Sequence, residues 1–400
     1  MCKEAKILLL ISAIFTLAMG LSGIFVNIFF WKQTSNFIVI VIYNLIHYIT
    51  MPFGFIIGGI LSKKKNGIWS LRLGLILYGL FYALILFIGN KGGIYIYILG
   101  IVYGFAAGFY WLAFNTLSFD FTCTTNRDTF NGFNGSCAGI AAAIAPITSG
   151  YIITRYIGNK GYNIVFAITL TMFIVLLLIS ILLKCNNYGK KLDFKKAFSR
   201  NCEDWSVIRK STMFWGFRDV IIAFVVNILI IETTNSELSL GKLTFMGALA
   251  SSAAYIIVQK IIKPPNRRLS ILIGTIGSFL AVLSIVFRVN YITLFIFMIF
   301  DSFILPFFII QLSSSTFNVI NKIHDEDMRI EYMINKDIAI NGGRVISSII
   351  LLGLLLSFKD AEVLKIYLLF IGVAPVVSGY FLRKLKDVLE GKKLPGCDKS

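Results

Sequence analysis

The chain has 400 residues, of which 57% are apolar and only 14% are charged, and its mean hydropathy is +0.81. These values exclude an ordinary soluble globular protein and leave room for about a dozen membrane spans of roughly 20 residues each. A net charge of +18 would suit nucleic acid in a soluble protein. Here the basic residues stand between apolar runs, so they indicate orientation in a lipid bilayer, and nucleic acid is rejected as a partner.

Apolar runs in chain order predict an all-α polytopic membrane protein with twelve transmembrane helices. The first six lie near 7–31, 37–61, 69–89, 94–118, 132–156 and 163–183. The last six lie near 211–232, 241–262, 270–287, 291–317, 338–357 and 363–382. We therefore expect four parts: an N-terminal six-helix half (1–183), a basic linker (184–210), a C-terminal six-helix half (211–383) and a tail (384–400).

Lys and Arg are concentrated in alternate loops, which predicts the orientation. Basic clusters follow the second span at Lys63–Lys65, fill the linker, and recur after the eighth span and in the tail. The intervening loops carry one or two basic residues each, such as Lys32 and Lys160. Positively charged loops stay on the cytoplasmic side of a membrane. We therefore expect the protein to lie in the cell membrane with both termini and the linker on the cytoplasmic side.

The two halves look like repeats offset by roughly 200 residues. Residues 58–74 and 256–274 each give an apolar helix end, a basic turn and a further helix. The loops at 126–128 and 325–331 match in the same way, and each leads into a glycine-bearing helix. Two such halves rocking against each other would expose a central site alternately to the two sides of the membrane, which predicts a transporter.

These features resemble the major facilitator superfamily over essentially the whole chain, and the resemblance implies two pseudo-symmetric six-helix halves and a monomer. Gly59, Leu61 and Lys63–Lys65 match the family's loop after the second span loosely, with Ser62 in place of its acid. The family's arginine in the fourth span is missing. Pro146 and Gly150 give a blurred version of a motif found in exporters.

The chain is also similar to a bacterial subgroup of uncharacterised permeases, which implies a transporter but no substrate. The matching residues are Tyr110, Trp111, Asn115, Leu117, Asn126, Arg127, Asp128, Asn131, Gly132, Glu237, Leu238, Leu240, Gly241, Glu331, Tyr332, Asn341, Gly343 and Arg344.

Four ionisable residues inside predicted spans are candidates for proton coupling or substrate contact, because a charge in the bilayer centre costs about 2.5–3.5 kcal/mol. Asp301 stands alone in the tenth span, where it either binds a proton or only ties helices together. Asp219 in the seventh span could face a cavity while Arg218 reaches toward the cytoplasm, or both could join a salt-bridge network. His47 in the second span either relays protons or packs. Glu232 and Glu237 are expected to be solvated acids near outer helix ends.

Two further sets of residues are predicted from their positions. Charges at the inner helix ends would pair when the inner side closes, unless they merely solvate the loops, and this gate comprises Arg127, Asp128, Arg329, Glu331, Asp337 and Arg344. Aromatic and amide side chains could line an apolar cavity, and these are Tyr103, Tyr110, Trp111, Asn115 and Trp215.

The sequence therefore predicts a secondary transporter that works by alternating access with proton coupling. Export of small amphipathic compounds is the first hypothesis, and uptake of a sugar or similar metabolite is the alternative. A transporter-like receptor or scaffold is a third hypothesis. No phosphate-binding loop is present, so ATP is not the expected energy source. Two histidines without a nearby Cys or acidic cluster argue against an enzyme, and neither a cofactor nor a metal is expected.

Overall fold

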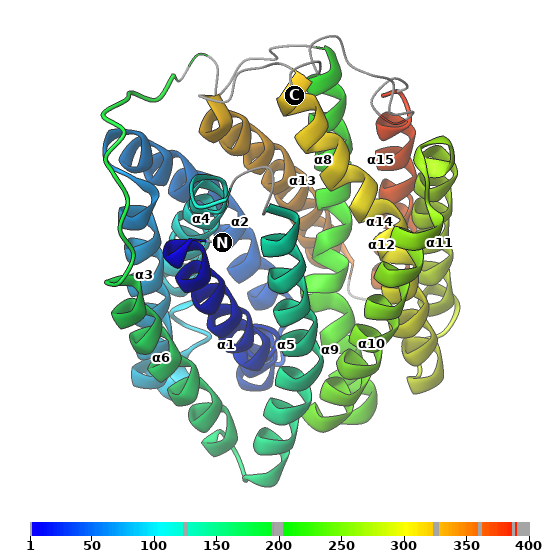
Figure 1. Cartoon of the computed structure of the whole chain (residues 1–400). Coiled ribbons are helices and arrows are strands. Elements are labelled where there is room, and N and C mark those ends of the chain that lie inside the picture. The colour runs from blue at the N-terminus through cyan, green and yellow to red at the C-terminus, as the bar shows by residue number, and fades with distance from the viewer. Residues whose placement is uncertain are drawn as a thin grey trace. The chain divides into compact units, whose positions relative to one another are not determined.

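The protein is all helical in the computed structural model, which describes residues 2–122, 127–193, 195, 203–322, 328–358, 362–385 and 389 (Figure 1). Within these residues, twelve helical segments are long and apolar enough to cross a membrane. This confirms the predicted all-α membrane fold with twelve spans. The described residues divide into two compact units, which are taken in turn.

The first unit comprises Met1–Leu192 and Ala223–Phe245. Its helices are α1 (Lys3–Thr34), α2 (Phe37–Lys64), α3 (Gly67–Ile88), the 3-10 helix η1 (Gly89–Lys91), α4 (Ile96–Asp120), α5 (Arg127–Arg155), α6 (Lys160–Ser180), α9 (Val226–Thr234) and the start of α10 (Glu237–Ile261). Asparagine side chains cap α2 and α3, because Asn36 and Asn66 accept hydrogen bonds from the otherwise unpaired first amides. The unit thus includes a segment, 223–245, from the second half of the sequence.

The second unit comprises Asp193–Ile222 and Met246–Ser400. Its helices are α8 (Glu203–Val220), the rest of α10, the 3-10 helix η3 (Pro264–Asn266), α11 (Arg267–Phe287), α12 (Tyr291–Lys322), α13 (Arg329–Ser357), α14 (Glu362–Gly372) and α15 (Ala374–Leu382). A buried core that includes Trp205, Trp215 and Phe308 joins α8 to its neighbours. A π-helical turn, η2 (Ile221–Val225), links α8 to α9, and the boundary between the units falls inside this turn.

The seventh, eleventh and twelfth spans differ from the prediction, and the eleventh begins at Arg329 instead of near 338. The seventh begins at Glu203 instead of near 211, because acidic residues suit a helix N-terminus and the buried Trp205 ring N–H donates to Asn335 at 2.9 Å. The twelfth is interrupted at Val373, between α14 and α15. Pro375 accounts for the interruption, since it has no N–H and its ring clashes with the carbonyl one turn earlier.

Glycines allow the backbones of α2 and α4 to touch. A Cβ atom added to Gly100 would lie 3.0 Å from the Tyr43 carbonyl oxygen, and one added to Gly54 would lie 3.0 Å from the Cα of Gly108. The sequence places Gly100, Gly104 and Gly108 on one helix face, and this face is the one that packs on α2. Small residues at such a contact are typical of membrane helix pairs, because packing replaces the hydrophobic effect there.

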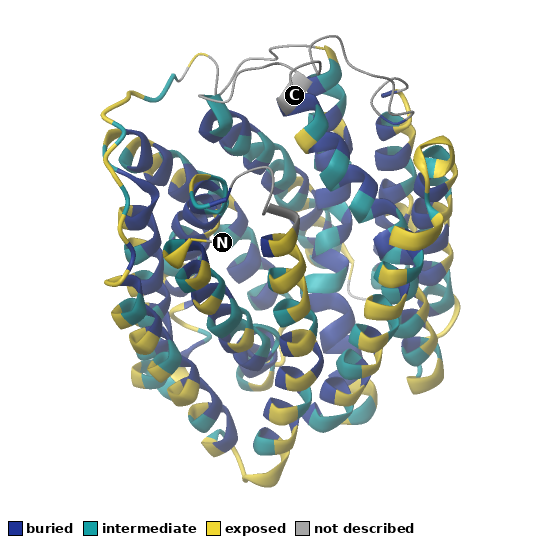
Figure 2. Cartoon of the chain, viewed as in Figure 1, coloured by how far each residue is buried: buried dark blue, intermediate teal, exposed yellow. Residues whose placement is uncertain are grey.

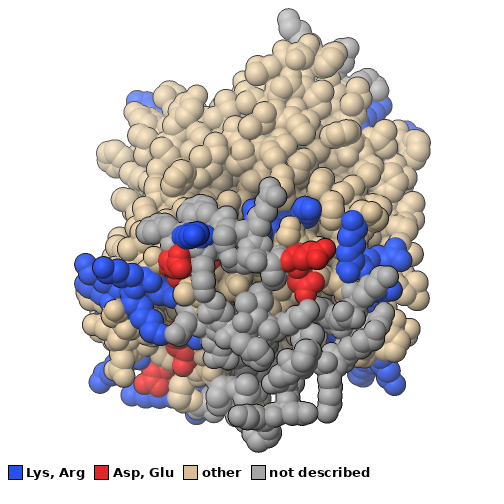
Figure 3. All heavy atoms as spheres, turned by 90° about the horizontal axis from the view of Figure 1, so that it is seen from above, with Lys and Arg blue, Asp and Glu red and all other residues tan. Residues whose placement is uncertain are grey.

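Large apolar side chains cover the exposed helix faces, as expected where lipid is the solvent. Figure 2 shows exposed residues as stripes along the helices, and on α2 one stripe contains Phe53, Ile57 and Ile60 at 53%, 46% and 40% exposure. On a soluble protein, such a row of exposed large apolar side chains would mark an interaction site. By contrast, Figure 3 shows charged side chains gathered in clusters, beside a broad area that carries no charge. The chain is a multi-pass membrane protein.

The start of the predicted linker is bound to the loop between α2 and α3, beside which it runs in Figure 1. The Tyr188 amide donates to the Lys65 carbonyl at 2.7 Å, and the Lys190 amide donates to the Lys63 carbonyl at 3.0 Å. The Tyr188 hydroxyl donates to the Asp120 carboxylate at the end of α4. Burial, reinforced by this carboxylate, raises the pKa of Tyr188, so the hydroxyl keeps its proton and remains a donor.

We expect Tyr188→Phe to loosen this segment, because it removes a hydrogen bond to a charged group. Tryptic cleavage after Lys190 and Lys191 should accelerate about fivefold, the factor that corresponds to about 1 kcal/mol of local stability. Peptide mapping of purified protein would measure the rates. Tyr156→Phe, at an exposed tyrosine on the loop after α5, is the control and should cleave like the wild type. Equal rates in all three proteins would contradict the role given to the hydroxyl.

Candidate functional site

Arg218 and Asp219 at the end of α8 are the centre of the candidate site, which lies wholly in the second unit. Successive residues on a helix point in different directions, about 100° apart, so the two side chains face different neighbours. Arg218 forms an ion pair with Asp301 of α12, and Asp219 forms one with Arg344 of α13. The sequence indicated all four residues but not their pairing.

The pair of Arg218 and Asp301 is nearly inaccessible, since the two side chains are 4% and 8% exposed. The Ser278 hydroxyl of α11 donates to the other Asp301 oxygen at 3.2 Å. The Trp215 ring lies 4.8 Å from the guanidinium carbon, so the cation also faces an aromatic surface. The Arg218 Nε–H has no hydrogen-bond partner among the described residues. Asp301 is therefore not a lone carboxylate, and Arg218 pairs inside the span instead of reaching toward the cytoplasm.

The pair of Asp219 and Arg344 is less buried, with side chains 23% and 20% exposed. Arg344 donates through Nε at 3.0 Å and through Nη2 at 2.7 Å to the same Asp219 oxygen. Its Nη1 donates to the Asn341 side chain at 3.1 Å, and Asn341 in turn donates to the Asp337 carbonyl. These residues form a polar cluster on α8 and one face of α13. The Oδ2 atom of the buried Asp337 has no hydrogen-bond partner within the described part of the chain.

Glycines bring the two helices close enough for this contact. A Cβ on Gly216 of α8 would collide with the Ile340 carbonyl, and one on Gly343 of α13 would collide with the Met213 carbonyl. Only glycine permits backbone contact at both points. The segment Asn341–Gly342–Gly343, which the sequence marks as a repeat feature, thus positions Arg344 opposite Asp219.

Of the remaining residues predicted for the gate, Arg329, Glu331 and Asp337 lie on α13. Glu331 is buried and accepts a hydrogen bond at 3.1 Å from the Asp193 amide of the linker, and Arg329 is half-buried at the start of α13. The side chains of Arg127 and Asp128 lie outside the described residues. The structure joins Arg344 to Asp219. The sequence places Arg344 in the gate and Asp219 among the candidates for proton coupling or substrate contact. Their part in a gate is a prediction.

The aromatic candidates fall into two groups. In the first unit, Tyr110 is buried and stacks on Phe15 with ring centroids 3.5 Å apart, and Tyr103 is half-buried beside His47 at 4.7 Å. On the same helix, Asn115 is half-buried and Trp111 is 41% exposed. In the second unit, Trp215 is buried between Phe308 and Arg218.

Three residues that contact the candidate residues of the two units were missed from the sequence. Ser278 and Phe15 carry no recognisable signal, because a serine or phenylalanine in an apolar span is typical of any membrane helix. Asn341 stood in a noted segment, but its position three residues before Arg344, on the same helix face, was the signal for its contact. Within the described residues, no group of three His, Cys, Asp or Glu side chains could hold a metal ion.

One family model and two bacterial relatives match this chain. The family model described as Major Facilitator Superfamily matches residues 8–328. The chain is 32% identical over 387 residues to the uncharacterised protein YqgE of Bacillus subtilis (strain 168), covering 96% of this chain and 90% of that protein. It is 42% identical over 164 residues, 41% of its length, to an uncharacterised protein encoded in the sodM 3′ region of Geobacillus stearothermophilus, of which it covers 77%.

Solved structures share the fold at low sequence identity. The nucleoside transporter NupG has a TM-score of 0.67 and 10% identity, with coverage of 96% of this chain and 99% of that one. A bacterial homologue of the iron transporter ferroportin in its inward-facing state has a TM-score of 0.68 and 14% identity, with coverage of 96% and 98%.

The burial of the Arg218 and Asp301 pair predicts strongly non-additive stability effects. We expect Asp301→Leu or Arg218→Met alone to lower the free energy of unfolding by about 3 kcal/mol, because each leaves an unpaired buried charge. The double variant should recover most of that loss, since neither charge remains. Unfolding by SDS in mixed micelles would measure all four proteins. Additive losses in the double variant would show that the two side chains do not depend on each other.

Proposed function

Because this chain belongs to the Major Facilitator Superfamily, a family of transporters, we propose that it carries a small molecule across the membrane by alternating access coupled to protons. The observation that carries this proposal is the pair of ionic contacts made by adjacent residues of α8. Charges within membrane spans are expensive, so those that persist commonly serve ion or substrate movement. Two such pairs from one helix give the second unit a charged centre.

We place proton binding first at Asp219. A carboxylate that exchanges protons with solvent must reach water during the cycle, and Asp219 is 23% exposed, whereas Asp301 is only 8% exposed. When Asp219 takes up a proton, its attraction to Arg344 weakens, while Arg344 keeps Asn341 as an acceptor. The freed guanidinium could then bind substrate. Asp301, held by Arg218 and Ser278, is the second candidate, and His47 is a third in the first unit.

Export of small amphipathic compounds is the cargo and direction we propose first. Within the first unit, the aromatic rings of Tyr103 and Trp111 would offer flat apolar surfaces to the apolar part of such a compound. Uptake of a sugar or similar metabolite is the alternative. The polar cluster of Asp219, Asn341 and Arg344 favours it, because carboxylate, amide and guanidinium groups are suited to hydroxyl-rich molecules.

We also propose that the protein works as a monomer in the cell membrane with both termini and the linker on the cytoplasmic side. The distribution of Lys and Arg between alternate loops supports this orientation. The gate predicted at the inner helix ends would then face the cytoplasm, with Glu331 bound to the linker.

Proton movement in proteoliposomes tests the proposal. Pooled metabolites and dyes are added to wild type, Asp219→Asn, Asp301→Asn and, as a control for loss of one acid, Glu232→Gln at an exposed position on α9. We expect a compound to cause proton flux in wild type and the control, and flux at least about tenfold lower in Asp219→Asn, as for loss of a proton-transfer group. Flux in cells or inverted vesicles gives the direction.

Each other result has a defined meaning. Equal flux in wild type and Asp219→Asn, with loss in Asp301→Asn, moves the coupling site to Asp301. Movement of a compound without protons in every protein removes proton coupling from the proposal. No movement of any compound across a broad pool contradicts transport and favours a receptor or scaffold.

A further inference from the structure

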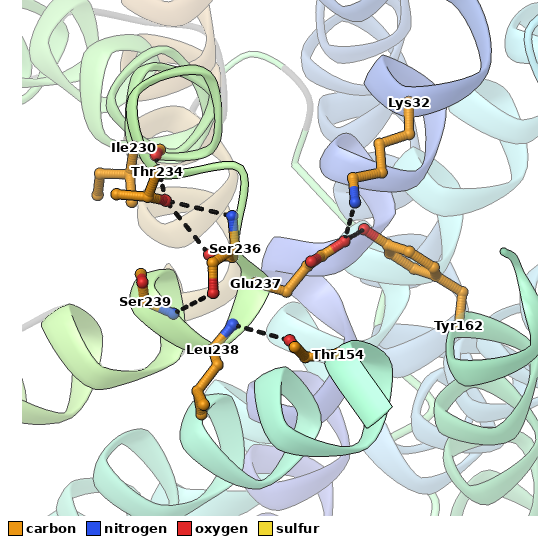
Figure 4. A network of polar contacts seen from close by, with 9 residues as sticks. All are labelled: Lys32, Thr154, Tyr162, Ile230, Thr234, Ser236, Glu237, Leu238 and Ser239. Carbon is orange, nitrogen blue, oxygen red and sulfur yellow. Dashed lines mark hydrogen bonds and ion pairs between the residues drawn. The ribbon is translucent and has the colours of Figure 1, made fainter. Parts of the chain in front are cut away.

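Glu237, at the first position of α10, is buried inside the first unit, whereas the sequence suggested a solvated acid near a helix end. Only 4% of the residue is exposed. Figure 4 shows its carboxylate between two helices of the first sequence half. The Lys32 ammonium, in the last turn of α1, forms an ion pair with Glu237 Oε1, and the Tyr162 hydroxyl of α6 donates to the same oxygen at 2.7 Å.

The backbone around Glu237 is docked on α5. A Cβ on Gly150 would lie 2.5 Å from the Glu237 carbonyl oxygen, and one on Gly241 would lie 2.5 Å from the Pro146 carbonyl oxygen. The Leu238 amide donates to the Thr154 hydroxyl at 3.2 Å (Figure 4). Glycines on both helices therefore permit backbone contact without interdigitated side chains. The start of α10 can thus separate from α5 without repacking of large side chains.

Hydrogen bonds hold the turn between α9 and α10 in a fixed shape. The Ser236 amide donates to the Thr234 hydroxyl at 3.3 Å, and the Ser239 amide donates to the Ser236 hydroxyl at 3.2 Å (Figure 4). Asn235 has a φ of +48°, in the left-handed region that asparagine tolerates better than most residues. Glu237 thus follows a hydrogen-bonded turn and is not part of a loose loop.

The energetics make this contact depend on the position of the segment. The Glu237 side chain is 6% exposed, and without Lys32 its charge would remain buried and unpaired at high cost. If the segment moved away, Glu237 and Lys32 would both be hydrated. The free energy lost on breaking the ion pair would then be small. Lys32 is already 40% exposed, so its ammonium can leave the contact readily.

We infer that Lys32, Tyr162 and Glu237 form an outer lock, which holds segment 223–245 of the second sequence half against α1, α5 and α6. This inference rests on the proposed function, because alternating access is what requires the segment to separate from the first-half helices and return. In the orientation proposed above, Lys32 and Glu237 lie at the outer ends of their spans. The lock keeps the outer side of the transporter closed. It opens when the transporter becomes accessible from the outer side of the membrane.

Spin-label distances within the first unit test the lock without a substrate. Labels are placed at Ile157, which is 98% exposed on the loop after α5, and at the exposed Thr233 of α9, in the full chain with its six native cysteines replaced by serine. In wild type, one short distance should dominate. In Glu237→Gln and in Lys32→Met we expect a longer distance, with the ratio of long to short raised about tenfold or more.

Three further variants separate a lock from a general weakening of the fold. The charge swap Lys32→Glu with Glu237→Lys should restore the short distance, because the ion pair is rebuilt in reverse. Tyr162→Phe should give a smaller shift, since it removes one neutral donor. Glu232→Gln, which removes an exposed acid on the neighbouring helix α9, should leave the distances unchanged.

Unchanged distances in both Glu237→Gln and Lys32→Met would overturn the inference, and so would a charge swap that behaves like the single variants. These outcomes are independent of the proposed function. A wild type that transports nothing would contradict transport, whereas the distances would still show whether the lock holds segment 223–245 in place.

Discussion

The need to pair charge inside an apolar environment is the constraint on which the second unit depends. Arg218 and Asp219 are neighbours on α8, yet their directions differ, so each must find its partner on a different helix. Asp301 of α12 and Arg344 of α13 satisfy them, and α8 is thereby tied to two other spans. Ser278 and Trp215 also contact the pair of Arg218 and Asp301, whereas Asn341 also contacts Arg344. Removal of any one charge leaves its partner without an opposite charge, so the packing of these helices depends on both members of each pair.

Close backbone contact is what allows these pairs to form. Gly216 and Gly343 bring α8 against α13, as Gly54 and Gly108 bring α2 against α4 and Gly150 and Gly241 bring α5 against α10. The helices differ in what lies beside the glycines. Beside Gly343 is the pair of Asp219 and Arg344, and beside Gly150 is the contact of Glu237 with Lys32. In both places a close backbone contact at glycines stands next to an ion pair.

The division into two units follows neither the apolar runs nor the linker alone. Residues 223–245 come after the linker, yet they pack with helices that precede it. The chain leaves the second unit within the π-helical turn Ile221–Val225, which begins two residues after Asp219. Such turns are frequent at functional sites because they break the regular hydrogen-bond ladder of a helix. The charged centre and the outer lock are therefore connected through one interrupted helix.

The sequence by itself determined the twelve spans and the transporter family, because runs of about 20 apolar residues and recurring motifs are local properties of a chain. It also identified Arg218, Asp219 and Asp301 as unusual, since a charge in an apolar run is visible without a fold. Only the tertiary structure decided which charges meet, because partners such as Arg218 and Asp301 are far apart along the chain. It also decided that Glu237 is buried, since burial of a residue at a helix end depends on which helices pack over it, and no pattern within α10 records the approach of Lys32 and Tyr162.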